Sequence, residues 1–396
     1  MTQPILPPAT IGVIGGGQLG MMTLREAQRM GYRTAVWDPD SDCPASRLSD
    51  ITIVAPFTDS GAAGRLADVS NVVTYEFENV DPACVDVISR RKPILPGSAI
   101  LKISRHRKLE KETLNNAGFP VIEFRIAKSE NEIRRAVEEL GLPVVVKTTT
   151  AGYDGKGQTV LHHQDDLNSF CRQMTGNDEF VVEKFIALQL EVSVIAVREN
   201  DGTVITFPVL ENEHRENILH VTRVPARISE EVEEEALRLA RSIINHFRMI
   251  GVLCVEMFVT PDGRVLVNEL APRPHNSGHF SLDACSMSQF EALVRSICSI
   301  PMQEPRLLSP CAMVNLLGKH LEHAELARIQ SLPGTKVHIY GKKKPEPRRK
   351  MGHVTIVGSS PEEVDEKIDV VEELIGEGVG IIGKKAEGMV SRVEKG

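Results

Sequence analysis

The chain has 396 residues, 41% hydrophobic and 25% charged, which is ordinary for a globular protein of two or three domains. Its formal net charge of -8 argues against a general affinity for nucleic acid or an anionic membrane. Seven cysteines form no Cys-x-x-Cys pair, and no apolar run reaches the roughly 20 residues of a membrane span. We therefore expect a reducing, cytoplasmic location.

The first part of the chain alternates predicted strands and helices. An apolar strand at 11–14 leads into a glycine-rich loop and a helix that ends near Gly31. Further strands are expected at 33–37, 51–55 and 71–75, before the unit ends at 93–97. This alternation predicts an α/β fold with a doubly wound parallel sheet.

The glycine-rich loop alone suggests a dinucleotide enzyme. Gly15, Gly17 and Gly20 match Gly-x-Gly-x-x-Gly, and Asp38 ends the next strand, where such enzymes place a ribose-binding acid. An NAD-dependent oxidoreductase is therefore one alternative, and a tight turn without a ligand is another. We favour neither, because such a loop accepts any phosphate and later segments are more specific.

A smaller unit follows a helix expected at 105–116. Lys147 ends an apolar strand, where a lysine is costly unless an anion meets it. Three glycines within 152–157 suit a flap whose N–H groups close over phosphates. Glu183 and Lys184 end the next strand, and Glu191 starts the one after, so that this connection can bind adenine and ribose. These features predict an ATP site.

The third unit contains a predicted hairpin with strands at 252–259 and 264–270. If Asp262 and Gly263 form a two-residue turn, Glu256 lies directly opposite Glu269. Two carboxylates roughly 5 Å apart repel each other, and a divalent cation between them removes that repulsion. The hairpin therefore predicts a magnesium site, and an exposed glutamate pair on an edge strand is the alternative.

Together these residues resemble the ATP-grasp superfamily over nearly the whole chain. The segment NELAPRPHNSGH at 268–279 and the loop GGGQLG at 15–20 are similar to the 5-(carboxyamino)imidazole ribonucleotide synthase family. The resemblance implies an N-terminal Rossmann-like domain (1–110), an ATP-grasp lid (111–190) and a C-terminal α+β domain that binds metal and ATP (191–396). It also implies a homodimer.

The resemblance implies a reaction as well. ATP and Mg²⁺ convert bicarbonate to carboxyphosphate, and the carboxyl group passes to 5-aminoimidazole ribonucleotide, giving ADP and phosphate. The nearest alternative is the formate-dependent glycinamide ribonucleotide transformylase. Asn276 favours the imidazole substrate, because the transformylase has an acid at that position. A non-catalytic nucleotide-binding regulator is a third possibility.

The resemblance also implies roles for residues that match the family's motifs. The ATP contacts would be Arg107, Lys147, Gly152, Tyr153, Asp154, Gly155, Lys156, Gly157, Gln158, Glu183, Lys184, Phe185, Ile186, Glu191, His214, Asn268 and Glu269. Glu256 and Glu269 would bind magnesium. By analogy with the transformylase, the ribonucleotide would contact Gln18, Leu19, Glu76, Asn276, Lys342, Arg349 and Lys350.

Acid–base roles are assigned as hypotheses. Asp154, beside Tyr153 on the flap, would take a proton from the substrate amine, and Arg273 and His275 would orient bicarbonate or carboxyphosphate. The basic stretch at 342–350 has no interleaved aromatic residues, which favours a small phosphate over nucleic acid. Ala271 stands where many superfamily members have asparagine, so phosphates or water are expected to complete the metal shell.

Overall fold

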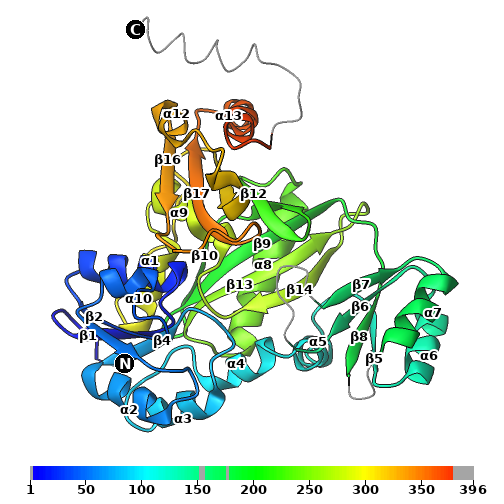
Figure 1. The fold of residues 1–396 in the computed structure, drawn as a ribbon, viewed down its shortest axis with the longest axis horizontal. Coiled ribbons are helices and arrows are strands. Elements are labelled where there is room, and N and C mark those ends of the chain that lie inside the picture. Colours follow the sequence, from blue (N-terminus) through cyan, green and yellow to red (C-terminus); the bar gives the residue numbers. More distant parts are fainter. Residues whose placement is uncertain (1–2, 151–156, 175–177, 378–396) are drawn as a thin grey trace, which may run out of the picture.

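In this computed structural model the described residues are 3–150, 157–174 and 178–377 (Figure 1). The first unit is a parallel sheet with strand order β3-β2-β1-β4. Its strands are β1 (Thr10–Ile14), β2 (Arg33–Asp38), β3 (Ile51–Val54) and β4 (Val72–Tyr75). Helix α1 (Gln18–Arg29) covers the face with Ile11 and Val13, whereas α2 (Ser60–Val69) and α3 (Pro82–Ser89) cover the face with Ile14. Helices on both faces confirm the doubly wound sheet.

Two short helices connect this unit to the next. They are α4 (Ser98–Ser104) and α5 (Arg107–Asn116). The helix expected from about residue 105 to 116 corresponds to α5, whereas α4 was not predicted. The helical conformation is interrupted between α4 and α5 at His106, whose backbone is extended and which immediately precedes α5. Arg107 is consequently the first residue of α5, where its backbone N–H bonds the carbonyl of Thr149.

The lid is a four-stranded antiparallel sheet with order β5-β8-β6-β7. Its strands are β5 (Phe124–Ala127), β6 (Val144–Thr148), β7 (Gln158–Leu161) and β8 (Phe180–Lys184). Helices α6 (Glu130–Leu140) and α7 (Gln164–Gln173) share one apolar core with the sheet. In Figure 1 the lid lies on the opposite side of the central domain from the N-terminal sheet.

The central sheet runs β14-β13-β9-β11-β12-β15-β17-β16, with β10 beside β9. Its strands are β9 (Leu190–Arg198), β10 (Val204–Thr206), β11 (Leu210–Arg215), β12 (Ile218–Val224), β13 (Gly251–Val259), β14 (Val265–Ala271), β15 (Cys311–Leu317), β16 (Thr335–Ile339) and β17 (Lys350–Val357). The helices are α8 (Glu230–His246), α9 (Ser281–Ala284), α10 (Gln289–Ile297), α11 (Gly318–Leu321), α12 (Leu326–Ser331) and α13 (Pro361–Leu374).

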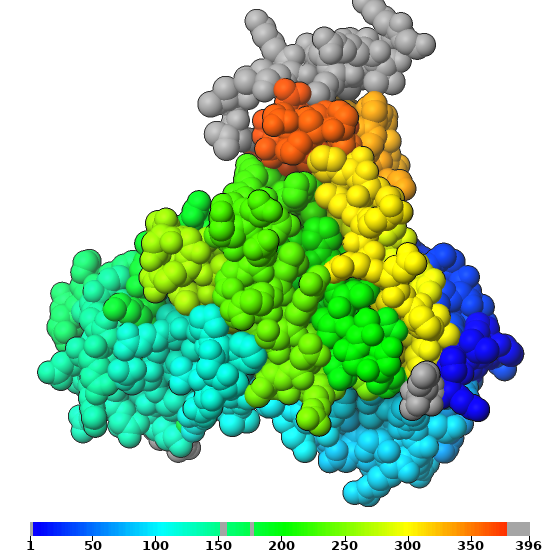
Figure 2. All heavy atoms as spheres, turned by 180° about the vertical axis from the view of Figure 1, so that it is seen from behind, coloured from blue at the N-terminus to red at the C-terminus, as the bar shows by residue number. Residues whose placement is uncertain are grey.

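The packing of this sheet joins the N-terminal unit to the central one. Helix α8 begins at the cap Ser229, carries three acids in its first turn, and packs its apolar stripe on one face of the sheet. On the other face, α10 and α1 share a single core with Ile195 and Val252. Seen from behind, α13 (orange) projects above the central domain (Figure 2).

The hairpin prediction is right about the pairing of Glu256 with Glu269 and wrong about the turn. Val259 pairs with Val265, and residues 261–263 form a three-residue turn with Gly263 at φ 78°. This turn shifts the pairing by one residue. A β-bulge then leaves Asn268 without a direct partner and shifts it back. The two offsets cancel.

Two further observations concern the cysteines and the helices. All seven cysteines are free thiols, and six of them are buried. Among the described residues, no helix has the length and apolar character that crossing a membrane requires.

Candidate active site

The paired strands β13 and β14 bring two carboxylates together. Glu256 and Glu269 are directly opposed, and His275 Nε2 lies 3.1 Å from Glu256 Oε1. Burial alone would raise the pKa of Glu256, but its hydrogen bond with His275 and the charge of that ring lower it to about 2. Burial by the surrounding protein and the charge of Glu256 raise the pKa of Glu269, although solvent reaches its side chain. The two carboxylates therefore repel each other.

This arrangement fits a magnesium ion that is shared with a nucleotide. A divalent cation would offset the repulsion, and carboxylate oxygens are the ligands that magnesium prefers. Within residues 3–150, 157–174 and 178–377 there is no group of three or more His, Cys, Asp or Glu side chains able to hold a metal. The two glutamates thus leave several coordination positions for phosphate oxygens or water.

Two cations reach one of these carboxylates, Glu269. Arg107 and Lys147 both lower the pKa of Glu269 through their charges, against the larger effect of burial. Arg107 Nη1 donates to the carbonyl of Thr148 at 2.9 Å, which fixes the guanidinium beside β6. The predicted ATP cations therefore lie close to Glu269, one of the two predicted metal carboxylates.

The side chain of Glu183 is fully engaged by protein. It is 1% exposed, and its two oxygens lie 3.0 Å from Lys111 Nζ and 2.7 Å from Lys147 Nζ. Burial would raise the pKa of Glu183, but the two lysines lower it to about 2. Any contact of Glu183 with ATP must therefore use its backbone. Lys184 and Phe185 beyond it are exposed, and Ile186 is half-buried.

A second pair forms on the central sheet. His214 Nδ1 lies 2.7 Å from Glu191 Oε2, joining two residues that were assigned to ATP. Burial would lower the pKa of His214, but its hydrogen bond to Glu191 and the charge of that carboxylate raise it. Gln158 at the start of β7 donates to Asn217 Oδ1 at 3.2 Å, which links the lid to the turn between β11 and β12.

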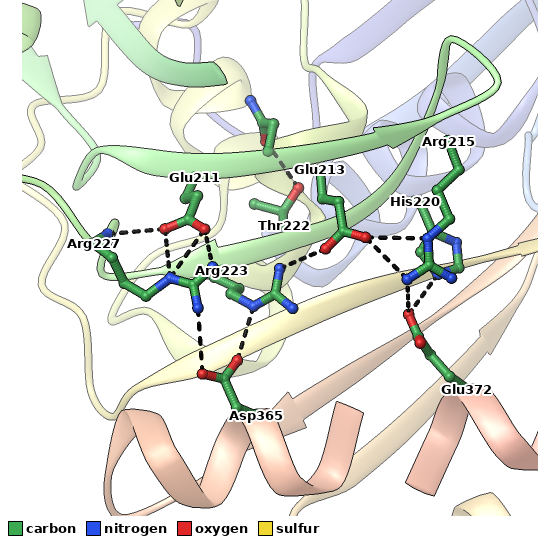
Figure 3. A network of polar contacts seen from close by, with 10 residues as sticks. Glu211, Glu213, Arg215, His220, Thr222, Arg223, Arg227, Asp365 and Glu372 are labelled. Atoms are coloured by element: carbon green, nitrogen blue, oxygen red, sulfur yellow. Dashed lines mark hydrogen bonds and ion pairs between the residues drawn. The ribbon is translucent and has the colours of Figure 1, made fainter. Parts of the chain in front are cut away.

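A polar network holds β11 from its other face (Figure 3). Arg223 Nε bonds Asp365 Oδ1 at 2.8 Å, and Arg215 Nη2 bonds Glu372 Oε1 at 2.7 Å, so α13 is tied to both strands of the hairpin. The other labelled members are Glu211, Glu213, His220, Thr222 and Arg227. The strand that carries His214 is consequently fixed from behind.

The glycine-rich loop is occupied by the chain's own carboxylates. Glu76 accepts the N–H groups of Gly17 and Gly20, and Asp38 accepts that of Gly16 at 2.7 Å. A Cβ on Gly20 would lie 2.4 Å from the carbonyl of Gly15, so the glycines serve close packing. A dinucleotide phosphate would meet these two carboxylates instead of free N–H groups. The loop therefore argues against the NAD alternative.

The residues assigned to the ribonucleotide lie in three places. Gln18 and the buried Leu19 begin α1 beside Glu76, and the buried amide of Asn276 exchanges two hydrogen bonds with Asn315, at 2.7 and 3.0 Å. Lys342 Nζ donates to the carbonyl of Lys350, and Arg349 Nη1 donates to the carbonyl of Lys344. The charge of Lys350 reaches Glu256, so the basic stretch at 342–350 approaches the metal carboxylates.

Gly318 packs against the backbone of this basic stretch. Its N–H donates to the carbonyl of Arg349 at 2.9 Å, and a Cβ placed on it would lie 2.0 Å from the carbonyl oxygen of Glu346. We expect Gly318→Ala to displace the stretch and to raise the KM for the ribonucleotide about tenfold or more, with the KM for ATP unchanged. Steady-state kinetics with each substrate varied checks this. Equal rises in both KM values would contradict it.

Sequence reasoning missed two residues of this site. Lys111 reads as a solvated position on a short amphipathic helix, although it is 2% exposed. Glu78 follows β4 without any motif, yet its Oε2 lies 2.7 Å from Arg273 Nε. No local pattern identifies either residue, because each meets its partner only through the tertiary fold. The assigned flap residues Gly152, Tyr153, Asp154, Gly155 and Lys156 lie outside the described residues.

Three family models match this chain. The ribonucleotide synthetase preATP-grasp domain matches residues 8–105, and the ATP-grasp domain matches residues 112–290. The phosphoribosylaminoimidazole carboxylase C-terminal domain matches residues 311–367. Together these models span the N-terminal sheet, the lid with the metal hairpin, and the basic stretch.

Curated relatives and solved structures agree with these matches. N5-carboxyaminoimidazole ribonucleotide synthase of Bacillus subtilis (strain 168) is 42% identical over 91% of this chain and 94% of the relative. The crystal structure of an ADP complex of N5-carboxyaminoimidazole ribonucleotide synthetase is 44% identical, with a TM-score of 0.90 over 94% of this chain and 98% of that one. An Aspergillus clavatus synthase in complex with ADP and 5-aminoimidazole ribonucleotide is 28% identical, with a TM-score of 0.85 over 93% and 98%.

Proposed function

The chain belongs to the N5-carboxyaminoimidazole ribonucleotide synthase family of ATP-grasp ligases, and from this premise we propose the roles of its residues and its carbon source. Its activity is the ATP-dependent carboxylation of 5-aminoimidazole ribonucleotide to N5-carboxyaminoimidazole ribonucleotide in purine biosynthesis. We propose that bicarbonate supplies the carboxyl group and is activated as carboxyphosphate. The direct opposition of Glu256 and Glu269, which suits a magnesium ion for phosphoryl transfer from ATP, supports the activation step.

Glu256 and Glu269 would hold the magnesium of MgATP. The bound ion supplies a Lewis acid that neutralises charge developing on the transferred phosphoryl group. His275 keeps Glu256 ionised through its hydrogen bond, so this carboxylate is ready to coordinate at neutral pH. Arg107 and Lys147, whose charges reach Glu269, would offset the negative charge of the ATP phosphates.

The remaining ATP contacts would come from the central sheet and from the lid. Glu191, paired with His214, would accept the ribose hydroxyls, and the 183–186 segment would offer its backbone to adenine. Asn268 would lie next to the nucleotide, because the bulge in β14 frees it from direct pairing beside Glu269. Gly157, Gln158 and the flap before them would cover the phosphates.

The acceptor would bind between the N-terminal sheet and the basic stretch. Gln18, Leu19, Glu76 and Asn276 would contact the ribonucleotide, and Lys342, Arg349 and Lys350 would neutralise its phosphate. Asp154 and Tyr153 would handle the proton of the acceptor amine. Arg273 and His275 would orient bicarbonate and then carboxyphosphate. His275 hydrogen-bonds Glu256, and the charge of Glu256 contributes to the raised pKa of Arg273.

One assay tests this proposal. Phosphate release from MgATP is measured with aminoimidazole ribonucleotide and bicarbonate omitted in turn, while labelled bicarbonate reports carboxylation. We expect label in the ribonucleotide product and phosphate in equal amount. Release that needs formate and glycinamide ribonucleotide instead would establish the transformylase alternative. The absence of any release that depends on the aminoimidazole ribonucleotide would overturn the assignment.

Two further expectations complete the proposal. We propose a homodimer on family membership alone, and light scattering on the purified chain would reveal a monomer if this is wrong. We propose a cytoplasmic location because all seven cysteines are free thiols and none lies in a disulfide.

A further inference from the structure

One ion pair joins the N-terminal domain to the segment that follows the metal hairpin. Glu78 lies three residues beyond β4, and Arg273 lies two residues beyond β14. Glu78 Oε2 is 2.7 Å from Arg273 Nε, and the side chains are 26% and 17% exposed. A carboxylate of one domain therefore holds the guanidinium that the other domain presents beside its metal carboxylates.

The charge state of the pair is well defined at neutral pH. Burial would raise the pKa of Glu78, but the charge and hydrogen bond of Arg273 lower it, so the carboxylate is ionised. Burial would lower the pKa of Arg273, but Glu78 raises it. A charge-assisted hydrogen bond of this kind restrains both the position and the plane of the guanidinium.

Among the residues that the structure describes, the hydrogen bonds of Arg273 leave one side of its guanidinium for a ligand. Its Nε bonds Glu78, and its Nη1 donates to the carbonyl of Pro274 at 3.2 Å. Because guanidinium is planar and rigid, these two bonds set the direction of the remaining Nη N–H groups. An oxyanion such as bicarbonate or carboxyphosphate accepts hydrogen bonds of that kind.

We propose that Glu78 is a positioning residue for the carboxylation: it fixes the plane of Arg273, whose remaining Nη N–H groups then hold the bicarbonate-derived oxyanion. The inference rests on the proposed role of Arg273 and extends it to the other domain. It also assigns a function to the contact between these domains, because Glu78 reaches Arg273 only when they are packed together.

The test compares Glu78→Gln, Glu78→Asp, Arg273→Lys and the double variant Glu78→Gln/Arg273→Lys with the wild-type chain. We expect Glu78→Gln to lower kcat/KM for bicarbonate by about 10–100-fold, since a misplaced positioning group costs that much. Affinity for ADP, measured by calorimetry, should stay within about twofold. Phosphate release should exceed carboxylated product, because poorly held carboxyphosphate is lost to water. Glu78→Asp, which keeps the charge, should recover part of the rate.

Arg29→Gln is the matched control. Arg29 in α1 pairs with Glu291 in α10 and so also links the N-terminal and central domains. If Glu78 acted only by docking the domains, Arg29→Gln would lower kcat/KM for bicarbonate in the same way. We expect it to leave that constant and the ratio of phosphate to product unchanged.

The double variant separates positioning from an independent effect. If Glu78 acts through Arg273, the double variant is no slower than Arg273→Lys alone. Losses of kcat/KM that add up in the double variant would overturn the inference while leaving the proposed function intact. So would a Glu78→Gln enzyme that is fully active and releases phosphate and product in equal amounts. A wild-type chain without turnover of the aminoimidazole ribonucleotide would overturn both.

Discussion

Replacing Glu269 or Glu256 by glutamine is expected to lower the carboxylation rate by at least about 10²–10³-fold, because a bound magnesium contributes several kcal/mol to phosphoryl transfer. Each substitution removes one of two opposed carboxylates and with it the reason for a cation to bind there. The measurement is kcat with the magnesium concentration varied. The concentration needed for half-maximal activity should rise in both variants.

The hairpin offers its own control for this experiment. Asp262 lies in the turn of the same hairpin, and it forms an ion pair with Arg264 in which both side chains are exposed to solvent. Asp262→Asn removes a carboxylate from the hairpin without touching the site, so its rate and magnesium dependence should match those of the wild-type chain. A Glu269→Gln enzyme that behaves like Asp262→Asn would show that the opposed carboxylates are not the metal ligands.

Glu183→Gln is expected to destabilise the lid by about 3–5 kcal/mol, because it leaves two lysines beside a neutral amide in a buried site. Lys111 and Lys147 are 3% and 14% exposed at the side chain, so water can replace little of the lost charge. Denaturation by urea, followed by a probe in the lid, measures the loss. The control is Glu179→Gln, since Glu179 also bonds two lysines but in a more exposed place, where such pairs contribute about 0–1 kcal/mol.

The same residue predicts how stability depends on pH. The folded pKa of Glu183 is about 2, below its ordinary value of 4.5, a difference that corresponds to about 3 kcal/mol. A depressed carboxyl pKa stabilises the fold fully above the unfolded value, and this contribution is lost as the pH falls from about 5 toward 2. Glu183→Gln should therefore show a flatter loss of stability in acid. If the stability of Glu183→Gln fell with pH as it does in the wild-type chain, the buried ion pairs of Glu183 with Lys111 and Lys147 would be contradicted.

The parts of the fold that were predictable are those coded by local pattern. The alternation of strands and helices gave the parallel sheet, and the side-chain period of two put Glu256 and Glu269 on one face. Their direct pairing was predicted from a two-residue turn that does not form. A three-residue turn and a bulge beside Asn268 each move the register by one residue, in opposite directions. The sequence signals neither offset, because bulges depend on how the sheet twists and packs.

The two missed residues share a different physical cause. Lys111 and Glu78 each meet partners far away in the chain, so their roles exist only in the tertiary structure. The glycine-rich loop illustrates the same limit. Its sequence is that of an anion-binding loop, but the anion it binds is the chain's own Glu76.

We propose that Glu256 and Glu269 hold magnesium mainly in company with the nucleotide. Manganese, used as a spectroscopic substitute for magnesium, can be titrated into the wild-type chain with and without ADP, with Glu269→Gln as the comparison. Two carboxylates are too few ligands for a tight site, so we predict weak binding without nucleotide and much tighter binding with ADP, lost in Glu269→Gln. Tight stoichiometric binding to the nucleotide-free chain would contradict the claim.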